Sequence, residues 1–276
     1  MAIYHLHTKH MTRSKGHSAV AAASYRTGEK LVDERENRTY DYTRKQNIKH
    51  CEIITPDHAP SWTHDRQTLW NEVEAIERRK DSRVAREVEV ALPRELGLEE
   101  HKQLLREFIK ENFTNEGMVA DVAIHHEKAG DGGNNPHAHI LLTTRAIEPE
   151  GFAAKKNTTW DKKASLQTWR ESWADKVNEH LENADSEQRI DHRSYEDQGI
   201  ELTPTQHMGK NATALERQGI ETEIGKANRM IEQVNRAIRF ARESIGQARD
   251  YAVEFYHYVR EPAQERQQTH EQGISR

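Results

Sequence analysis

Alternating hydrophobic and polar positions predict four β-strands in the N-terminal part of the chain. They are Ala2–Thr8, Arg86–Leu92, Met118–His126 and His137–Thr144. In Arg86–Leu92, Glu87 and Glu89 fall on one side of the strand and valines on the other, which is typical of a strand with one solvated face. The last two strands flank a turn rich in glycine and asparagine, so we expect them to form an antiparallel hairpin.

Apolar residues at helical spacing predict four helices around these strands. They are Ala19–Tyr25, Leu69–Glu77, Glu99–Phe113 and Leu166–Leu181. Ser18 is placed to cap the first of them, and Gly28 to end it.

The C-terminal part carries a different pattern, a seam of apolar residues spaced alternately three and four apart. Its members are Ile224, Ala227, Ile231, Val234, Ile238, Ala241, Ile245, Ala248, Ala252 and Phe255. This spacing predicts one long helix or a coiled coil, ending at Pro262. We therefore expect a catalytic domain over residues 1–205 and a helical extension over residues 206–276. The seam could pack on the domain or on another chain.

Charge is distributed unevenly along the 276 residues. The net charge is -5, yet residues 1–50 hold ten Lys and Arg against five acids. A basic face on an acidic protein can meet phosphates, although ordinary variation along a surface gives the same count. The single cysteine, Cys51, excludes an intrachain disulfide and a cysteine zinc cage, and fits a reducing cytoplasm. Neither a membrane span nor a secretory signal is visible.

Histidines are numerous, and their placement suggests a metal site. His137 and His139 share a strand face, and the predicted hairpin brings His125 or His126 beside them. Three neutral imidazoles can hold a divalent cation and leave coordination positions open for a substrate. A surface strand could carry the same spacing without binding metal. Glu87 and Glu89 could orient a ligand histidine, or simply lie on a solvated edge.

Tyr25 can be a nucleophile if its proton is removed. A tyrosine on a helix more often has a packing role, and composition does not single it out among the eight tyrosines.

Several segments resemble the MobA/MobL relaxases of mobilisable plasmids. The resemblance covers about residues 1–220 and rests on Met1–Leu6, Ser18–Glu29, Arg86–Pro93, Val122–His125, Asn135–Arg145, Asp191–Ser194 and Gln206–Gly209. It implies an α+β fold, with a central antiparallel sheet flanked by helices and a three-histidine site on the sheet. Here a long C-terminal helix would follow.

The resemblance also implies an activity. Tyr25 would attack a phosphodiester at the nick site of a transfer origin, leaving a 5′-phosphotyrosine and a free 3′-hydroxyl, and the reverse attack would reseal the strand. The metal ligands fall on His125, His137 and His139, with His126 left without a role. Glu87, or alternatively Glu89, would orient a ligand histidine or receive the tyrosine proton.

The cofactor implied is Mn²⁺ or Mg²⁺. By intrinsic affinity, three imidazoles suit manganese or another transition metal better than magnesium. The partner is single-stranded or melted DNA, and Lys9, Arg13, Lys15 and Arg26 could follow its backbone. Accessory mobilisation proteins and a secretion-system coupling protein are further expected partners. Since relatives carry extra C-terminal domains, the chain either relies on separate proteins or is part of a longer one.

Three alternatives stay open. A rolling-circle replication initiator shares the chemistry, but in that family the tyrosine follows the histidine motif, whereas Tyr25 precedes it. A hydrolytic metalloenzyme would use water in place of the tyrosine. A non-catalytic DNA-binding accessory protein would carry a degenerate site.

Overall fold

The computed structural model describes residues 4–129 and 132–273. The chain divides into two compact units, Met1–His192 and Arg193–Arg276. The division falls before the predicted domain boundary at residue 205, which stays a prediction.

The first unit is built on a five-stranded antiparallel sheet with strand order β1-β5-β7-β6-β4. These strands are β1 (Leu6–Thr12), β4 (Ile48–Ile54), β5 (Arg83–Ala91), β6 (Ala120–Lys128) and β7 (Asn134–Leu142). Two short hairpins lie outside this sheet: β2 (Lys30–Asp33) with β3 (Arg38–Asp41), and β8 (Ile147–Glu148) with β9 (Gly151–Phe152). The predicted α+β fold with a central antiparallel sheet is confirmed.

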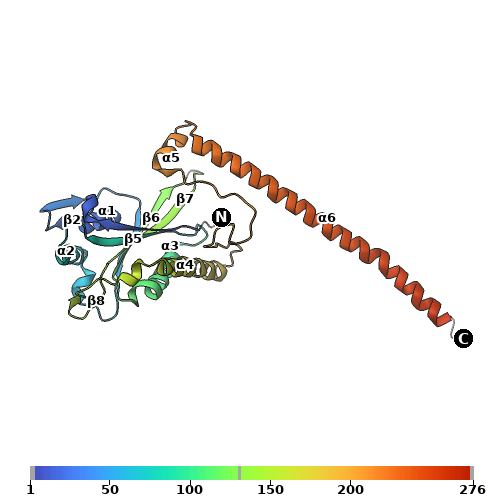
Figure 1. Ribbon diagram of the computed structural model, residues 1–276, viewed down its shortest axis with the longest axis horizontal. Coiled ribbons are helices and arrows are strands. Elements are labelled where there is room, and N and C mark those ends of the chain that lie inside the picture. Colours follow the sequence, from blue (N-terminus) through green and yellow to red (C-terminus); the bar gives the residue numbers. More distant parts are fainter. Residues whose placement is uncertain (1–3, 130–131, 274–276) are drawn as a thin grey trace. The chain divides into compact units, whose positions relative to one another are not determined.

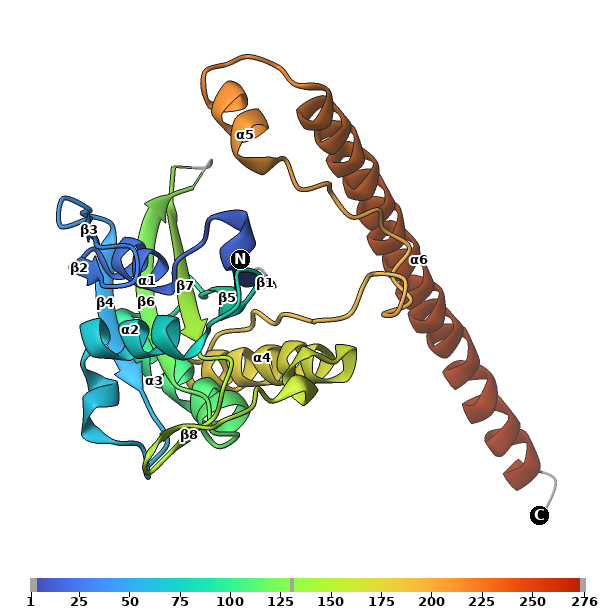
Figure 2. The same ribbon diagram turned by 60° about the vertical axis from the view of Figure 1, so that its left-hand side comes forward.

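Helices cover both faces of the sheet, as Figures 1 and 2 show. Helices α3 (Leu98–Ile109) and α4 (Lys163–Asn183) bury Phe108 and Trp173 against one face, in a core that includes Val88 and Ile140. On the other face, α1 (Ala19–Thr27) and α2 (Arg66–Ile76) form a smaller core with Trp70. Because side chains alternate along a strand, each strand contributes to both cores.

The first helix begins and ends as the sequence predicts. Ser18 accepts a hydrogen bond from the backbone N–H of Ala21, 3.1 Å away, and its own hydroxyl donates to buried Asp33. Gly28 has a φ of +68°, and a Cβ there would collide with Ile48 at the start of β4. A glycine is therefore favoured here by the left-handed backbone, and an added side chain would also displace the end of the Ile48 side chain.

The expectation of a solvated face on Arg86–Leu92 is wrong. β5 lies inside the sheet between β1 and β7, and only 1% of Glu87 is exposed. The alternation of charge misled the prediction because the buried carboxylate is compensated by ion pairs rather than by water. The strand predicted at Ala2–Thr8 begins later, at Leu6, and residues 2 and 3 lie outside the described residues. Strand β4 was not predicted at all.

The second unit consists of α5 (Gly209–Arg217) and a 51-residue helix, α6 (Glu223–Gly273). The long helix confirms the prediction made from the heptad pattern. The prediction that it ends at Pro262 is wrong, because the helix continues to Gly273 although a proline removes one helical hydrogen bond. No helix within the described residues is long and apolar enough to cross a membrane.

Candidate metal and nucleophile site

Three histidines converge on the sheet face that α1 covers. His125 on β6 pairs directly with His137 on β7, and His139 follows two residues later on the same face. One ring nitrogen from each of the three lies within 4.8 Å of the others. The antiparallel register therefore brings together the three imidazoles that the sequence placed on neighbouring strands.

The other ring nitrogen of each histidine is held by an oxygen acceptor. Nδ1 of His139 donates to Glu87 (2.9 Å), Nδ1 of His137 to the carbonyl of Asn135 (3.0 Å), and Nε2 of His125 to the carbonyl of Arg26 (2.6 Å). In a neutral imidazole, each bond fixes the proton on the bonded nitrogen and leaves the second nitrogen able to accept a cation.

Burial lowers the pKa of His125 to about 4, against the opposing hydrogen bond to Arg26, and nearby positive charge lowers it further. This histidine is therefore neutral at physiological pH, as a metal ligand must be. The donor set as a whole fits a divalent metal, and the triad supports one without indicating which.

The neighbouring His126 does not belong to the cluster. It follows His125 on β6, so its side chain leaves the opposite face of the strand. Its ring lies 6.3 Å from that of His101, on α3. Strand alternation thus selects His125 from the two candidates that the hairpin alone left open.

Glu87 lies at the centre of a charge network behind the triad. Besides His139, it binds Nε of Arg26 at 2.5 Å and Nζ of Lys9 at 2.6 Å. Burial by itself would raise the pKa of Glu87, but the hydrogen bonds from His139, Arg26 and Lys9 hold it well below its usual range. The carboxylate is therefore ionised throughout the physiological range, and its cations compensate the cost of burying it.

Glu89 is a weaker partner of the same histidine. It pairs with His139 in the register of β5 and β7, yet its carboxylate is 4.0 Å from Nδ1 and its side chain is 33% exposed. The contact of His139 with Glu87 is shorter, at 2.9 Å, and the Glu87 carboxylate is more buried.

Helix α1 brings Tyr25 to this face of the sheet. The next residue, Arg26, binds His125 through its carbonyl and Glu87 through its guanidinium. The Tyr25 side chain is itself 48% exposed. Its ring meets Tyr42 edge-on and lies under the ammonium of Lys45. No described contact joins the phenol to a histidine directly.

The four basic residues suggested for DNA have different surroundings. Arg13 is turned inward, where it binds the carboxylate of Glu74 and backbone carbonyls around the end of α2. Arg26 is buried against Glu87, whereas Lys9 is half exposed and Lys15 is exposed. The structure thus leaves Lys9 and Lys15 accessible, although Lys9 also pairs with Glu87, and it turns the two arginines toward intramolecular partners.

One residue at the site was missed from the sequence. Lys45 contacts both the ring and the backbone of Tyr25. It lies twenty residues later in a polar loop, where a lysine is unremarkable. Lys45 reaches α1 only through the packing of the loop that precedes β4, and no local sequence pattern predicts that contact.

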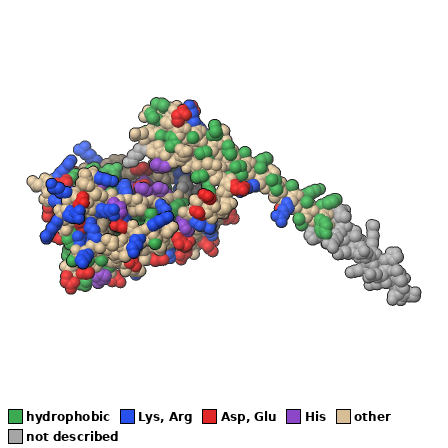
Figure 3. Space-filling model, viewed as in Figure 1, with side chains coloured by type: hydrophobic (Ala, Val, Ile, Leu, Met, Phe, Trp, Pro, Cys, Tyr) green, Lys and Arg blue, Asp and Glu red, His purple; other side chains and the backbone are tan. Residues whose placement is uncertain are grey.

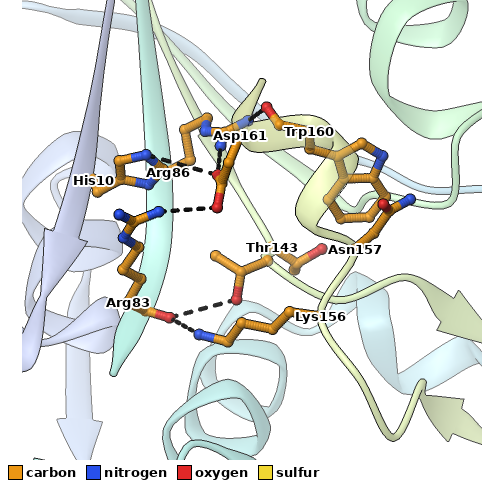
Figure 4. Close-up of a pocket in the computed structure, with 9 residues that line it drawn as sticks. His10, Arg83, Arg86, Thr143, Lys156, Asn157, Trp160 and Asp161 are labelled. Carbon is orange, nitrogen blue, oxygen red and sulfur yellow. Dashed lines mark hydrogen bonds and ion pairs between the residues drawn. The ribbon is translucent and has the colours of Figure 1, made fainter. Parts of the chain in front are cut away.

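A second polar cluster lies at the other ends of β5 and β7, far along the strands from the histidines (Figure 4). Asp161 there pairs with Arg83 and Arg86 and lies 3.7 Å from His10. The cavity among these groups measures about 20 Å³, the space of a water molecule. Its charges are paired internally, so the cluster holds the 3₁₀ turn η4 (Thr158–Asp161) against the sheet.

The fold and the triad together define an α+β protein with a cluster of three histidines on an antiparallel sheet that could hold a metal ion. The MobA/MobL family model matches residues 17–218. The chain belongs to the MobA/MobL family.

Curated relatives extend this result. The chain is 37% identical over 299 residues to "Probable mobilization protein MobA" of Bifidobacterium longum, covering 93% of this chain and 52% of that protein. It is 38% identical over 246 residues to "Mobilization protein MobL" of Acidithiobacillus ferridurans, covering 79% and 64%. With "Conjugal transfer protein TraA" of Agrobacterium fabrum it shares 34% over 310 residues, covering 95% and 28%. The chain thus spans less than two thirds of the length of these relatives.

A solved structure shares the fold. The chain from "Molecular Basis of Vancomycin Resistance Transfer in Staphylococcus aureus" has 34% sequence identity and a TM-score of 0.65. The match covers 70% of this chain and all of that one.

Proposed function

We propose that this protein is a plasmid mobilisation relaxase that nicks one DNA strand at a transfer origin through Tyr25. The observation that carries the proposal is the docking of α1 on the triad. Arg26 binds His125 and Glu87, so the adjacent tyrosine is held at the edge of a three-histidine site. The names of the relatives, which are mobilisation and conjugal transfer proteins, support the same function.

In the proposed reaction, the phenol of Tyr25 loses its proton and its oxygen attacks a phosphodiester. The new O–P bond is a 5′-phosphotyrosine, and the departing 3′ oxygen takes up a proton to become a free hydroxyl. One phosphoester bond replaces another, so a later attack by a 3′-hydroxyl on the phosphotyrosine reseals the strand and releases the tyrosine. Exposure of the Tyr25 side chain leaves the phenol open to a strand from solution.

His125, His137 and His139 would hold the metal, Mn²⁺ or Mg²⁺, through the nitrogens that their hydrogen bonds leave free. When bound, the cation supplies positive charge to the non-bridging phosphate oxygens, where negative charge develops during transfer. The rest of the network orients these ligands. Preorganised ligands need little rearrangement when metal and DNA arrive.

Glu87 has the role of an orienting residue in this proposal. Its carboxylate is ionised and already bound to Lys9, Arg26 and His139, so it is a weak acceptor for a phenolic proton. Its hydrogen bond instead fixes the tautomer and ring angle of His139. The structure favours Glu87 over Glu89 for this role by the shorter and more buried contact.

The proposed substrate is single-stranded or melted DNA. On the face shown in Figure 3, Lys and Arg side chains gather over the part of the unit that carries α1 and β2. Exposed members of the basic N-terminal region are Lys9, Lys15, Lys30, Arg35, Arg38, Arg44 and Lys49. Contacts of this kind with a DNA backbone make binding depend strongly on salt. We propose action in the bacterial cytoplasm, with accessory mobilisation proteins and a coupling protein as partners.

Helix α6 is proposed as the element that meets a helical partner. Val234, Ile245 and Phe255 of its seam are each more than half exposed. An apolar stripe at heptad spacing is the surface that a coiled-coil partner covers.

The test is the capture of a covalent adduct. Single-stranded DNA from the region flanking the gene is incubated with the protein and Mn²⁺ or Mg²⁺, and denatured samples are examined for DNA attached to protein. The expected adduct disappears in Tyr25→Phe and with chelator, and persists in Tyr40→Phe, a control on β3 outside the site.

Other results would change the assignment. Cleavage without an adduct would favour a hydrolytic metalloenzyme. Metal binding without cleavage of any strand of the region would favour a non-catalytic DNA-binding accessory protein. Self-sustained replication of a plasmid carrying only this gene and its origin would favour a replication initiator.

A further inference from the structure

A short segment between β3 and β4 closes over the end of α1. The backbone N–H of Lys45 donates to the carbonyl of Tyr42 (3.0 Å), which makes a tight turn. The turn lies against Gly28, the glycine that ends the helix. Residues 42–45 thus pack against the last turn of α1, where Tyr25 is located.

Lys45 holds Tyr25 at two points. Its ammonium lies 3.8 Å from the centroid of the tyrosine ring and donates to the tyrosine carbonyl at 2.8 Å. A cation over an aromatic face is attracted to it, and more strongly where water is excluded. Tyr42 adds an edge-on contact, with ring centroids 5.2 Å apart. An otherwise exposed side chain is thereby held from its face and its edge.

The same segment is attached to the strand that carries the metal ligand His125. The backbone carbonyl of Asn47 accepts a hydrogen bond from His126 (2.8 Å), and its side chain donates to Glu127 (3.1 Å). Residues 42–47, here called the clip, therefore bind the tyrosine at one end and β6 at the other. The clip is a second connection between Tyr25 and the triad, independent of the one through Arg26.

We propose that Lys45 is a positioning residue for the nucleophile, through which the clip sets the place of the Tyr25 phenol relative to the histidine site. The inference rests on the proposed function, since it concerns the same tyrosine. A tyrosine that is half exposed samples several rotamers, and only one that presents the phenol to the histidine site can react. Holding the ring in that rotamer raises the rate of attack without changing how tightly DNA binds.

This prediction differs from that of a simple phosphate contact. If Lys45 served only to attract DNA, its loss would weaken binding and leave the rate at saturation unaltered. If it positions Tyr25, the effect appears in the rate at saturation. The two roles therefore separate when affinity and rate are measured on the same variants.

The experiment compares Lys45→Met, which keeps the aliphatic stem, with Lys45→Arg, which keeps the cation. Lys163→Met, at the start of α4 and outside the residues proposed to contact DNA, is the matched control for the loss of one positive charge. The rate of adduct formation is measured at saturating single-stranded DNA, and the Kd is measured in a Tyr25→Phe background. We expect Lys45→Met to slow the reaction at least tenfold with a Kd within threefold of the parent, and Lys45→Arg to recover most of the rate.

A second readout needs no activity. Proteins labelled with 3-fluorotyrosine give a ¹⁹F resonance for residue 25, assigned by its loss in Tyr25→Phe. We expect this resonance to move in Lys45→Met and to stay in place in Lys163→Met. An unchanged resonance, or a rate loss explained entirely by Kd, would overturn the inference. If the parent forms no adduct while the resonance moves, the proposed function fails and the contact of Lys45 with Tyr25 stands.

Discussion

The backbone carbonyl of Arg26 lies 2.6 Å from Nε2 of His125. This contact joins the last turn of α1 to β6 across almost one hundred residues of sequence. It occupies one nitrogen of the histidine and leaves the other for a cation, while the neighbouring Tyr25 is brought to the same edge of the sheet. One hydrogen bond therefore serves both the candidate metal site and the proposed nucleophile.

Replacing Glu87 tests the orienting network. We expect Glu87→Gln to weaken metal affinity about 10–100-fold, because the hydrogen bond that fixes the tautomer of His139 is altered. Glu89→Gln, 4.0 Å from the same nitrogen and partly exposed, should change it less than about threefold. Isothermal titration with Mn²⁺ measures both, with circular dichroism as the check on folding. Equal effects of the two variants would contradict the assignment of Glu87.

The stability of the α2 face depends on a buried ion pair. Asp121 on β6 has a side chain 1% exposed and binds Arg66 at 2.8 Å and the indole N–H of Trp70 at 2.8 Å. Asp121→Ala leaves the arginine charge without its buried partner, so we expect a loss of about 3–5 kcal/mol in the free energy of unfolding. Urea denaturation measures it. Asp81→Ala, which removes an exposed pair with Arg79, should cost less than about 1 kcal/mol.

The single cysteine reports on packing between β4 and the end of α1. Burial raises the pKa of the Cys51 thiol to about 12, with Arg66 opposing the rise. Because only the thiolate reacts, the fraction available at pH 8 is far smaller than in the unfolded chain and grows as pH rises toward 12. We expect a thiol–disulfide reagent to modify the native protein at least a hundredfold more slowly than the protein in urea. Similar rates in both would show that this edge of the sheet is open.

The catalytic unit should work without the long helix. Within the described residues, both hydrophobic cores of the first unit end at or before Ile190. A chain ending at residue 220 should therefore still nick a short oligonucleotide at a rate within about threefold of the full chain. Single-turnover cleavage measures this. Loss of cleavage in a truncated protein that still unfolds cooperatively would show that α6 completes the site.

Much of the fold follows from local pattern. The caps at Ser18 and Gly28 mark the first helix because they act on neighbouring backbone groups. The hairpin of β6 and β7 follows from two alternating runs and the turn between them. The heptad seam likewise predicts α6, although the effect of Pro262 was overestimated. β4 escaped detection since its apolar and polar residues do not alternate cleanly.

The sequence by itself determined which residues are chemically competent and which of them share a strand: the histidine pair, the carboxylates of Arg86–Leu92 and the tyrosine on a capped helix. Only the tertiary structure decided how they combine. Packing of α1 on the sheet brings Tyr25, of the eight tyrosines, close to the histidine cluster and supports the proposal that it is the nucleophile. The same packing places Arg26 over Glu87, which is buried and ionised instead of solvated. Such choices depend on contacts between residues far apart in the chain, and periodicity within one segment carries no information about them.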